Sequence, residues 1–255
     1  MRIIIIGVGN LATHLSLALQ SAGNEIVQVY SRTIDSASSL AAKLDVPFTN
    51  QVSEINPNAD LYIYALSDDV LESFVQNSIA PDAIHVHTAG SVSIDIFKNY
   101  KENYGVFYPL QTFSKIKPVD FSNIPLFIEA SNDAALQKLS KLATSISKNV
   151  YQINSEQRLK LHIAGVFANN FVNHLYKLAS DIATSADIPF DAIKPLIMET
   201  AEKIQILRPE ESQTGPAKRN DLKVLEKHRE LLKNDDEILK LYNQLSDMIL
   251  KSYQG

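Results

Sequence analysis

Short apolar runs alternate with amphipathic stretches over the first 153 residues of the chain. Runs such as Ile3–Ile6 and Leu61–Leu66 are apolar throughout, which is typical of strands covered by helices on both faces. This alternation predicts an α/β fold with a doubly wound parallel sheet of the Rossmann type. The predicted strands are Ile3–Ile6, Ile26–Tyr30, Leu61–Leu66, Ile84–Thr88, Gly105–Tyr108, Leu126–Glu129 and Val150–Ile153, and the predicted helices between them are Leu11–Ala22, Asp35–Leu44, Val70–Asn77 and Ala134–Lys148.

The strand pattern stops after residue 154. Apolar residues in the segment 155–186 then recur at three- and four-residue spacing, which predicts one long amphipathic helix. We therefore expect a Rossmann domain over residues 1–153 and an all-α domain over residues 154–255. The later predicted elements are a helix over Phe190–Ile206 that follows Pro189, a polar loop over Arg208–Asn220, and helices over Asp221–Lys233 and Asp236–Tyr253.

Composition and charge exclude several classes of function. The net charge is −5 and the basic residues form no stripe, so we expect no nucleic-acid partner. The chain has no cysteine, which excludes disulfides, thiolate catalysis and cysteine zinc sites, and we expect no metal site. Its first apolar run is too short for a membrane span or a signal-peptide core, and it begins too early to leave room for a targeting peptide. These features predict a cytoplasmic protein without a membrane partner.

The strongest motif, Gly7-Val8-Gly9-Asn10-Leu11-Ala12, directly follows the first predicted strand. A GxGxxA pattern is weak by itself, but here it opens a helix and a second strand follows, as a dinucleotide-binding turn requires. Gly7 would allow the tight turn, Gly9 would let a pyrophosphate approach the backbone, and Ala12 would allow close helix–strand packing. The helix N-terminus favours anions. The motif therefore predicts a dinucleotide site; the alternative is a strand–turn–helix without a ligand.

The segment Ser31-Arg32-Thr33 stands at the end of the second predicted strand, where an NAD enzyme usually has a carboxylate for the ribose 2′-hydroxyl. Two hydroxyls and a guanidinium suit a 2′-phosphate, which a carboxylate would repel. We therefore expect NADP as the cofactor; the alternative is that Arg32 is a solvated loop residue.

Two further loops are expected beside the cofactor, because ligands of such sheets bind at the carboxyl ends of the strands. One contains Leu66, Ser67 and Asp68, and the favoured interpretation of Asp68 is a helix N-cap. The other is Thr88-Ala89-Gly90-Ser91, where a nicotinamide and a substrate would meet, with a simple turn as the alternative. His85 and His87 alternate along the preceding strand, so we expect both on one buried face.

Candidate catalytic residues lie on the predicted long helix. His162 and Asn169 are seven residues apart and share a helix face, while Asn170 is rotated toward its edge. A histidine titrates near neutrality and can protonate a carbonyl or imine during hydride transfer, so His162 is the leading candidate for the proton donor. The alternative is a hydrogen bond between helices.

Lys218 and Arg219 follow a Thr-Gly-Pro turn in the polar loop. Arg219 could hold a substrate carboxylate or the cofactor phosphate, and a solvated loop is the alternative. We expect the active site to lie between the two domains.

These residues carry a resemblance to a known family. The chain is similar to predicted NADP oxidoreductases that combine a Rossmann-like domain with a helical domain of unknown function. They are related to pyrroline-5-carboxylate reductases, 3-hydroxyisobutyrate dehydrogenases and deazaflavin-dependent NADP reductases. The family often has histidine where this chain has Tyr108, and glycine where it has Asn220. The segments that carry the resemblance are Gly7–Ala12, His87–Ser91, Tyr108–Phe113, His162–Asn170 and Thr214–Asp221.

The resemblance matches Asn170 to the family's asparagine and implies a homodimer built through the helical domain. It supplies no substrate. We expect an NADP(H)-dependent oxidoreductase that transfers a hydride to or from a small carbonyl, imine or hydroxy acid. Two alternatives stay open: an NADP-binding sensor without catalysis, and a reductase that exchanges hydride between NADP and a deazaflavin. They differ in the cleft, since an enzyme needs a proton donor near the nicotinamide.

Overall fold

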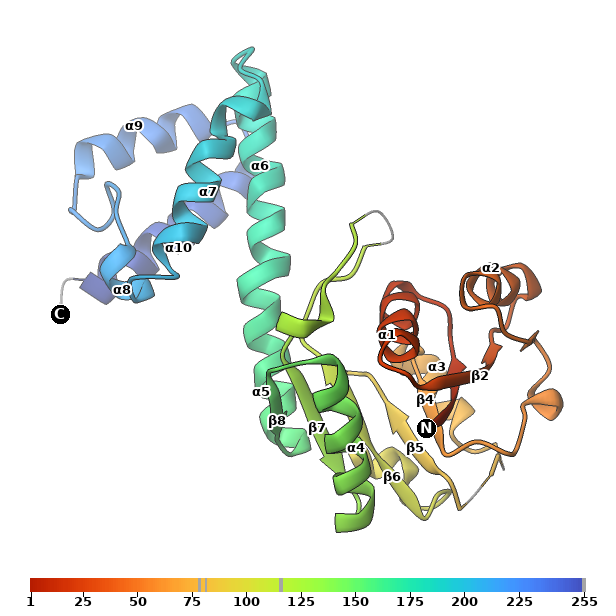
Figure 1. Cartoon of the computed structure of the whole chain (residues 1–255). Helices are drawn as coiled ribbons and strands as arrows, with labels where there is room; N and C mark the ends of the chain where they lie inside the picture. The colour runs from red at the N-terminus through yellow and green to blue at the C-terminus, as the bar shows by residue number, and fades with distance from the viewer. Residues whose placement is uncertain (78, 81, 115–116, 254–255) are drawn as a thin grey trace. The chain divides into compact units, whose positions relative to one another are not determined.

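The computed structural model describes residues 1–77, 79–80, 82–114 and 117–253 (Figure 1). The chain forms two compact units, Met1–His174 and Leu175–Gly255, which we call the first and second units. The first unit holds every strand of the described part of the chain.

An eight-stranded sheet in the order β3-β2-β1-β4-β5-β6-β7-β8 forms the centre of the first unit. After β1 the chain builds outward on one side, and from β4 it builds outward on the other, so the strand order reverses between β1 and β4. Ligands of doubly wound sheets bind beside such a reversal. The strands are β1 Arg2–Ile6, β2 Glu25–Tyr30, β3 Phe48–Thr49, β4 Leu61–Tyr64, β5 Ile84–His87, β6 Asn103–Pro109, β7 Leu126–Ala130 and β8 Val150–Gln152.

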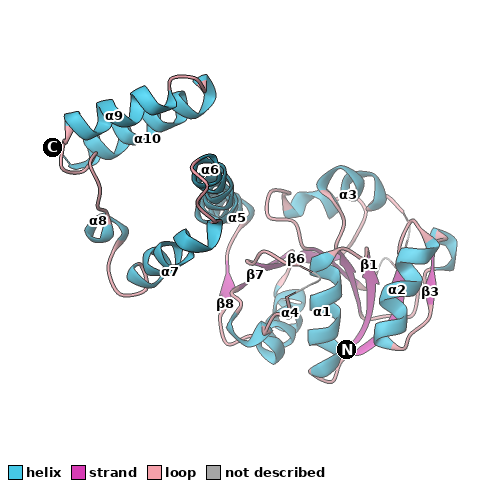
Figure 2. Cartoon of the chain, turned by 90° about the horizontal axis from the view of Figure 1, so that it is seen from above, coloured by secondary structure: helices cyan, strands magenta, loops and turns pink. Residues whose placement is uncertain are grey.

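Helices cover both faces of this sheet, as Figure 2 shows, which confirms the predicted doubly wound fold. Ile3 and Ile5 pack on one face with residues of α1 (Asn10–Ser21), α2 (Ile34–Leu44) and α4 (Asp133–Ile146). The alternate residues Ile4 and Ile6 pack on the other face with α3 (Asp68–Phe74). Successive side chains of a strand point to opposite faces, so a strand between two helical layers is apolar at every position.

The sheet departs from the predicted parallel pattern at one pair of strands. β6 and β7 are antiparallel, while the other paired strands are parallel. Between them the chain forms only the short 3₁₀ turn Phe121–Asn123 in its described part. Antiparallel neighbours need no crossover helix between them. The absence of a predicted helix between these two strands was therefore a sequence signal for the antiparallel pairing. The strand β3 was not predicted, because its two residues are too few to give an apolar pattern.

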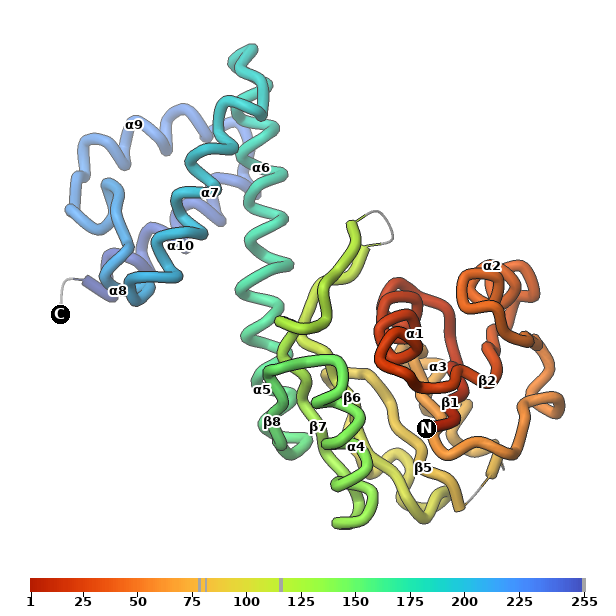
Figure 3. The backbone as a smooth tube through the Cα atoms, viewed as in Figure 1, coloured from red at the N-terminus to blue at the C-terminus, as the bar shows by residue number. Residues whose placement is uncertain are grey.

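The predicted long helix is confirmed. It consists of α5 (Ser155–Gly165), a π-helical segment Val166–Phe171, and α6 (Val172–Ser185), which run on continuously (Figure 3). Asn154 caps its start, because its side chain accepts from the Gln157 N–H at 2.9 Å and Gln157 bonds back to the Asn154 N–H. The first unit ends at His174, in the first turn of α6. The domain boundary predicted between residues 153 and 154 instead follows the last strand, β8.

In its described part, the second unit consists of helices joined by turns and loops and contains no strand. Its helices beyond α6 are α7 (Lys194–Lys203), α8 (Pro209–Ser212), α9 (Leu222–Leu232) and α10 (Asp236–Tyr253). The turn α8 lies inside the segment predicted as a loop, because Pro209 stands at its first position and Glu211 accepts from the Arg208 N–H at 3.1 Å. Within the described residues, no helix combines the length and the apolar character that crossing a bilayer requires.

Candidate functional site

The turn between β1 and α1 is built as the glycine motif requires. Gly7 has φ +106° and donates its N–H to the Tyr30 carbonyl at 2.9 Å. A Cβ on Gly7 would lie 2.2 Å from the Ala65 carbonyl oxygen, so only glycine fits beside β4. Gly9 differs, because a Cβ there would meet nothing within 4 Å. The space over Gly9 is therefore open to a ligand that approaches the backbone.

Helix α1 presents its N-terminus at this open space. Its first turn carries no acidic residue, and the N–H groups of a first helical turn have no partner within the helix. Val8 and Leu11 pack partly against the core, and Ala12 is buried, so these side chains hold the turn. The Asn10 side chain is engaged elsewhere, since it donates to the Phe113 carbonyl at 2.9 Å. The backbone of the motif, rather than its side chains, is what a diphosphate would meet.

Ser31, Arg32 and Thr33 lead from β2 into the N-terminus of α2. Ser31 is buried, whereas Arg32 and Thr33 are exposed. Thr33 is the N-cap of α2, and its side chain makes no cap hydrogen bond. No ion pair involves Arg32 in the described part of the chain. The segment thus offers a free guanidinium and two hydroxyls, the donor set that a phosphomonoester needs.

The loops after β4 and β5 are joined by a hydrogen bond from the Ser91 hydroxyl to the Asp68 carboxylate. This corrects the N-cap interpretation of Asp68: the cap of α3 is Ser67, and Asp68 is the first helical residue, with its side chain turned to Ser91. The predicted N-cap was one residue too late because serine and aspartate are both favoured at N-caps. The sequence order Ser67-Asp68 does not show which of the two caps the helix.

The predicted burial of the two strand histidines is confirmed, since His85 and His87 are both 0% exposed. Burial lowers the pKa of His87 to about 3, so its ring is neutral at physiological pH. Nδ1 of this ring accepts the Ala89 N–H at 3.2 Å, which fixes the start of the loop after β5. His87 therefore supports the loop rather than titrating in it.

Gly90 brings the loop after β5 against two side chains from distant parts of the chain. A Cβ on Gly90 would lie 2.6 Å from Nδ1 of His162 and 3.0 Å from Cζ of Tyr108. The Tyr108 hydroxyl lies 3.3 Å from His162 Nδ1. The loop after β5, the end of β6 and the third turn of α5 therefore meet at one point. The sequence pattern indicated Gly90 and His162 as site residues, whereas Tyr108 stood out only as a departure from the family pattern.

A cavity of about 310 Å³ opens beside this contact. The π-helical segment accounts for the presence of both Asn169 and Asn170 in its wall, because a π turn spreads one extra residue over the turn. The wall carries hydroxyl, imidazole and carboxamide groups but no charged side chain. Its lining residues, all from the first unit, are Tyr108, Leu110, Gln111, Thr112, His162, Gly165, Val166, Ala168, Asn169 and Asn170.

A buried ion pair anchors the start of α5, the helix that carries His162. The Arg158 guanidinium, which is 1% exposed, bonds to the Glu129 carboxylate of β7 and to the Val92 carbonyl. Ser155 joins the same group, donating its hydroxyl to Glu129 at 2.8 Å and its N–H at 3.0 Å. This network was not predicted, because an arginine in an amphipathic helix has the same sequence pattern whether it is solvated or buried.

Arg219, the predicted residue in the polar loop, belongs to the second unit and is exposed. Its neighbour Lys218 is engaged: Nζ donates to the Gln213 carbonyl at 2.8 Å and lies 4.7 Å from the centre of the Tyr253 ring. The role of Arg219 stays a prediction.

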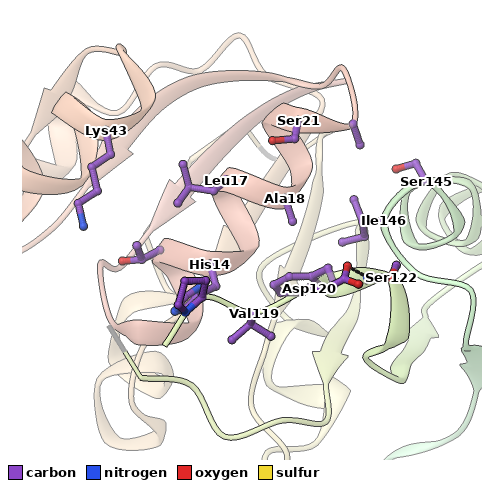
Figure 4. Close-up of a pocket in the computed structure, with 14 residues that line it drawn as sticks. His14, Leu17, Ala18, Ser21, Lys43, Val119, Asp120, Ser122, Ser145 and Ile146 are labelled. Atoms are coloured by element: carbon purple, nitrogen blue, oxygen red, sulfur yellow. Dashed lines mark hydrogen bonds between the residues drawn. The ribbon is translucent and has the colours of Figure 1, made fainter. Parts of the chain in front are cut away.

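A larger cavity, of about 630 Å³, lies in the first unit between α1, the end of α4 and the loop before β7 (Figure 4). Its wall includes His14, Lys43 and Asp120. None of the residues predicted to bind cofactor or substrate lines it. We therefore place the candidate site at the smaller cavity beside Gly90.

Comparison with protein families gives two successive matches along the chain. Residues 2–96 match the family described as coenzyme F420-dependent NADP oxidoreductase. Residues 124–249 match a domain of unknown function, DUF2520. No curated protein matches the chain.

Solved structures show the same relationship. A Bacteroides fragilis protein provisionally assigned as an NADP oxidoreductase is 44% identical, with a TM-score of 0.91 and 98% of both chains covered. A Thermotoga maritima protein is 26% identical, with a TM-score of 0.77 and coverage of 96% of this chain and 99% of that one. A pyrroline-5-carboxylate reductase from Streptococcus pyogenes is 12% identical, with a TM-score of 0.65 and 98% of both chains covered, and shares the fold.

Proposed function

Because the chain belongs to the NADP oxidoreductase family that carries a DUF2520 domain, we propose that it transfers hydride between NADP(H) and a small substrate. The substrate class we propose is a carbonyl, an imine or a hydroxy acid. The observation that carries the proposal is the contact of Gly90 with His162 and Tyr108 at the carboxyl end of the sheet. This contact would put the imidazole ring of His162 where the loop after β5 meets a nicotinamide.

The residues of the first unit fit the cofactor. The open space over Gly9 and the N-terminus of α1 would take the diphosphate, and Arg32 with its neighbouring hydroxyls would take the 2′-phosphate. The loops containing Ser67 and Gly90 would flank the nicotinamide. When bound, the nicotinamide supplies or accepts the hydride.

His162 supplies the proton in this proposal. In the reductive direction the substrate carbon receives the hydride, and the carbonyl oxygen or imine nitrogen takes a proton from the protonated His162 ring. In the oxidative direction the neutral ring removes that proton. Asn169 and Asn170 line the same cavity, and their amides can orient the reacting group by hydrogen bonds.

The proposed activity is tested by following the loss of reduced nicotinamide absorbance with NADPH and a panel of small ketones, aldehydes and cyclic imines. Turnover of any member supports the proposal. Tight NADPH binding without turnover, or with release of a protein partner instead, would favour the sensor alternative.

The family name directs attention to a second candidate, hydride exchange with a deazaflavin coenzyme. Pockets for ligands of drug size have volumes of roughly 300–1,000 Å³. The cavity beside His162, at about 310 Å³, lies at the lower end of that range and favours a small substrate.

Cofactor choice gives the first prediction. We expect the protein to bind NADPH at least about ten times more tightly than NADH, because Arg32 has no competing ion-pair partner in the described structure. Arg32→Glu should remove this preference by taking away a phosphate ligand and adding repulsion. Lys141→Glu, an equal change of charge at an exposed position of α4, is the matched control. Nicotinamide fluorescence titration with both cofactors measures the preference, and an equal fall for both in Arg32→Glu would contradict it.

The second prediction is a homodimer through the helical part of the chain. Large apolar side chains are exposed there, including Leu196 at 68%, Ile206 at 86% and Leu231 at 80%. Such exposure over several helices is typical of a surface covered by a second copy. We therefore expect light scattering to give about twice the 28.4 kDa mass of one chain at micromolar concentration. A mass of one chain at that concentration would contradict the dimer.

A further inference from the structure

The Tyr108 ring is held firmly at the floor of the candidate site. It stands on β6, is 9% exposed, and lies 6.5 Å from the Phe127 ring of β7, which in turn stacks on Tyr151 of β8 at 5.2 Å. Burial raises the pKa of the Tyr108 hydroxyl, and the positive charge of Arg158 opposes part of that rise. A tyrosine with a raised pKa stays protonated near neutrality, so its hydroxyl can both donate and accept a hydrogen bond.

His162 meets this hydroxyl through one particular nitrogen. Tyr108 Oη lies 3.3 Å from Nδ1, and the two rings are edge to face, with centres 6.4 Å apart and planes at 68°. Gly90 closes the same side of the imidazole, since a Cβ there would fall 2.6 Å from Nδ1. Nδ1 is therefore occupied by the protein, and the other ring nitrogen, Nε2, is left for a ligand of the cavity that His162 lines.

We propose that Tyr108 is a positioning residue that holds His162 by Nδ1, so that Nε2 is the nitrogen that exchanges a proton with the substrate. This inference rests on the proposed function. The Tyr108 hydroxyl oxygen accepts from the Nδ1–H, so the lone pair of the neutral ring lies on Nε2, where the proton is taken up or released.

The anchoring of α5 supports this role. The ring of His162 is one turn beyond Arg158, whose buried bonds to Glu129 and to the Val92 carbonyl tie the helix to β7 and to the segment after β5. The backbone on which the imidazole stands is thus fixed on two sides. What remains free is rotation of the imidazole about its own side-chain bonds, and the Tyr108 hydroxyl with the close surface of Gly90 restricts that rotation.

The test is the nitrogen NMR spectrum of the His162 ring, identified by its loss in His162→Gln. In the unmutated protein we expect the neutral ring to carry its proton on Nδ1, hydrogen-bonded to Tyr108, and to have its lone pair on Nε2. Tyr108→Phe should shift the Nδ1 resonance and mix the two neutral tautomers. Tyr151→Phe, which removes a hydroxyl from the same aromatic stack, should leave the ring signals unchanged.

Gly90→Ala provides a second variant, because its methyl group would separate the two rings without altering either side chain. We expect the same spectral change as in Tyr108→Phe. Unchanged His162 signals in Tyr108→Phe, in a protein with the original melting temperature, would overturn the inference and leave Tyr108 as a packing residue. Failure of the proposed function would be seen separately, as absence of turnover of every panel compound by the unmutated protein.

Discussion

Replacing His162 with alanine is expected to lower NADPH-dependent turnover by a factor of about 10² to 10⁴, the usual contribution of a positioned proton donor. NADPH affinity should be preserved, because the phosphate ligands lie on other elements, at Gly9 and Arg32. The rate is measured with the compound that the unmutated protein reduces fastest, and the affinity by nicotinamide fluorescence.

His174→Ala is the matched control for this experiment. His174 lies on α6 beyond the π-helical segment, is exposed, and does not line the cavity beside Gly90. Its loss should leave turnover within about twofold of the original, as is usual for surface substitutions away from special features. Equal rates in His162→Ala and the unmutated protein would remove His162 from the mechanism.

Replacing Gly7 with alanine is expected to destabilise the first unit by about 3 kcal/mol. Two causes act together: the positive φ of +106°, and the 2.2 Å approach of the new Cβ to the Ala65 carbonyl oxygen of the segment after β4. Neither can relax easily, because Gly7 is bonded to Tyr30 through its N–H. Chemical denaturation followed by circular dichroism measures the change.

Within the same motif, the substitution Gly9→Ala distinguishes an effect on protein stability from an effect on NADPH binding. Gly9 has φ −67° and an open space at its Cβ position, so an alanine there should change the free energy of unfolding by less than about 1 kcal/mol. The same methyl group would occupy the path of the diphosphate, and NADPH affinity should fall by about tenfold or more. A Gly9→Ala protein that binds NADPH normally would show that the diphosphate does not approach this glycine.

The elements that the sequence predicted are those whose signals are local. The apolar runs at β1 and β4, the glycines before α1, and the three- and four-residue spacing along α5 and α6 each need only neighbouring residues to be recognised. The place of Ser31-Arg32-Thr33 directly after β2 was predicted in the same way, while its role as a phosphate site stays a prediction.

The parts that escaped prediction depend on contacts between distant segments. Tyr108 and His162 are 54 residues apart, and Gly90 has a role only because both rings converge on it. The pairing of Arg158 with Glu129 is equally invisible in either segment alone. The π-helical segment that turns both Asn169 and Asn170 to the cavity has no residue signature that helical periodicity would detect.

The central claim is that NADP(H) lies along the β1–α1 turn with its nicotinamide at the cavity beside Gly90. A crystal structure of the protein with bound NADPH tests it most directly. We expect the diphosphate over Gly9, the 2′-phosphate at Arg32, and the His162 ring within hydrogen-bond reach of a group resting on nicotinamide C4. A nicotinamide placed away from this cavity, or a His162 ring turned away from it, would contradict the account.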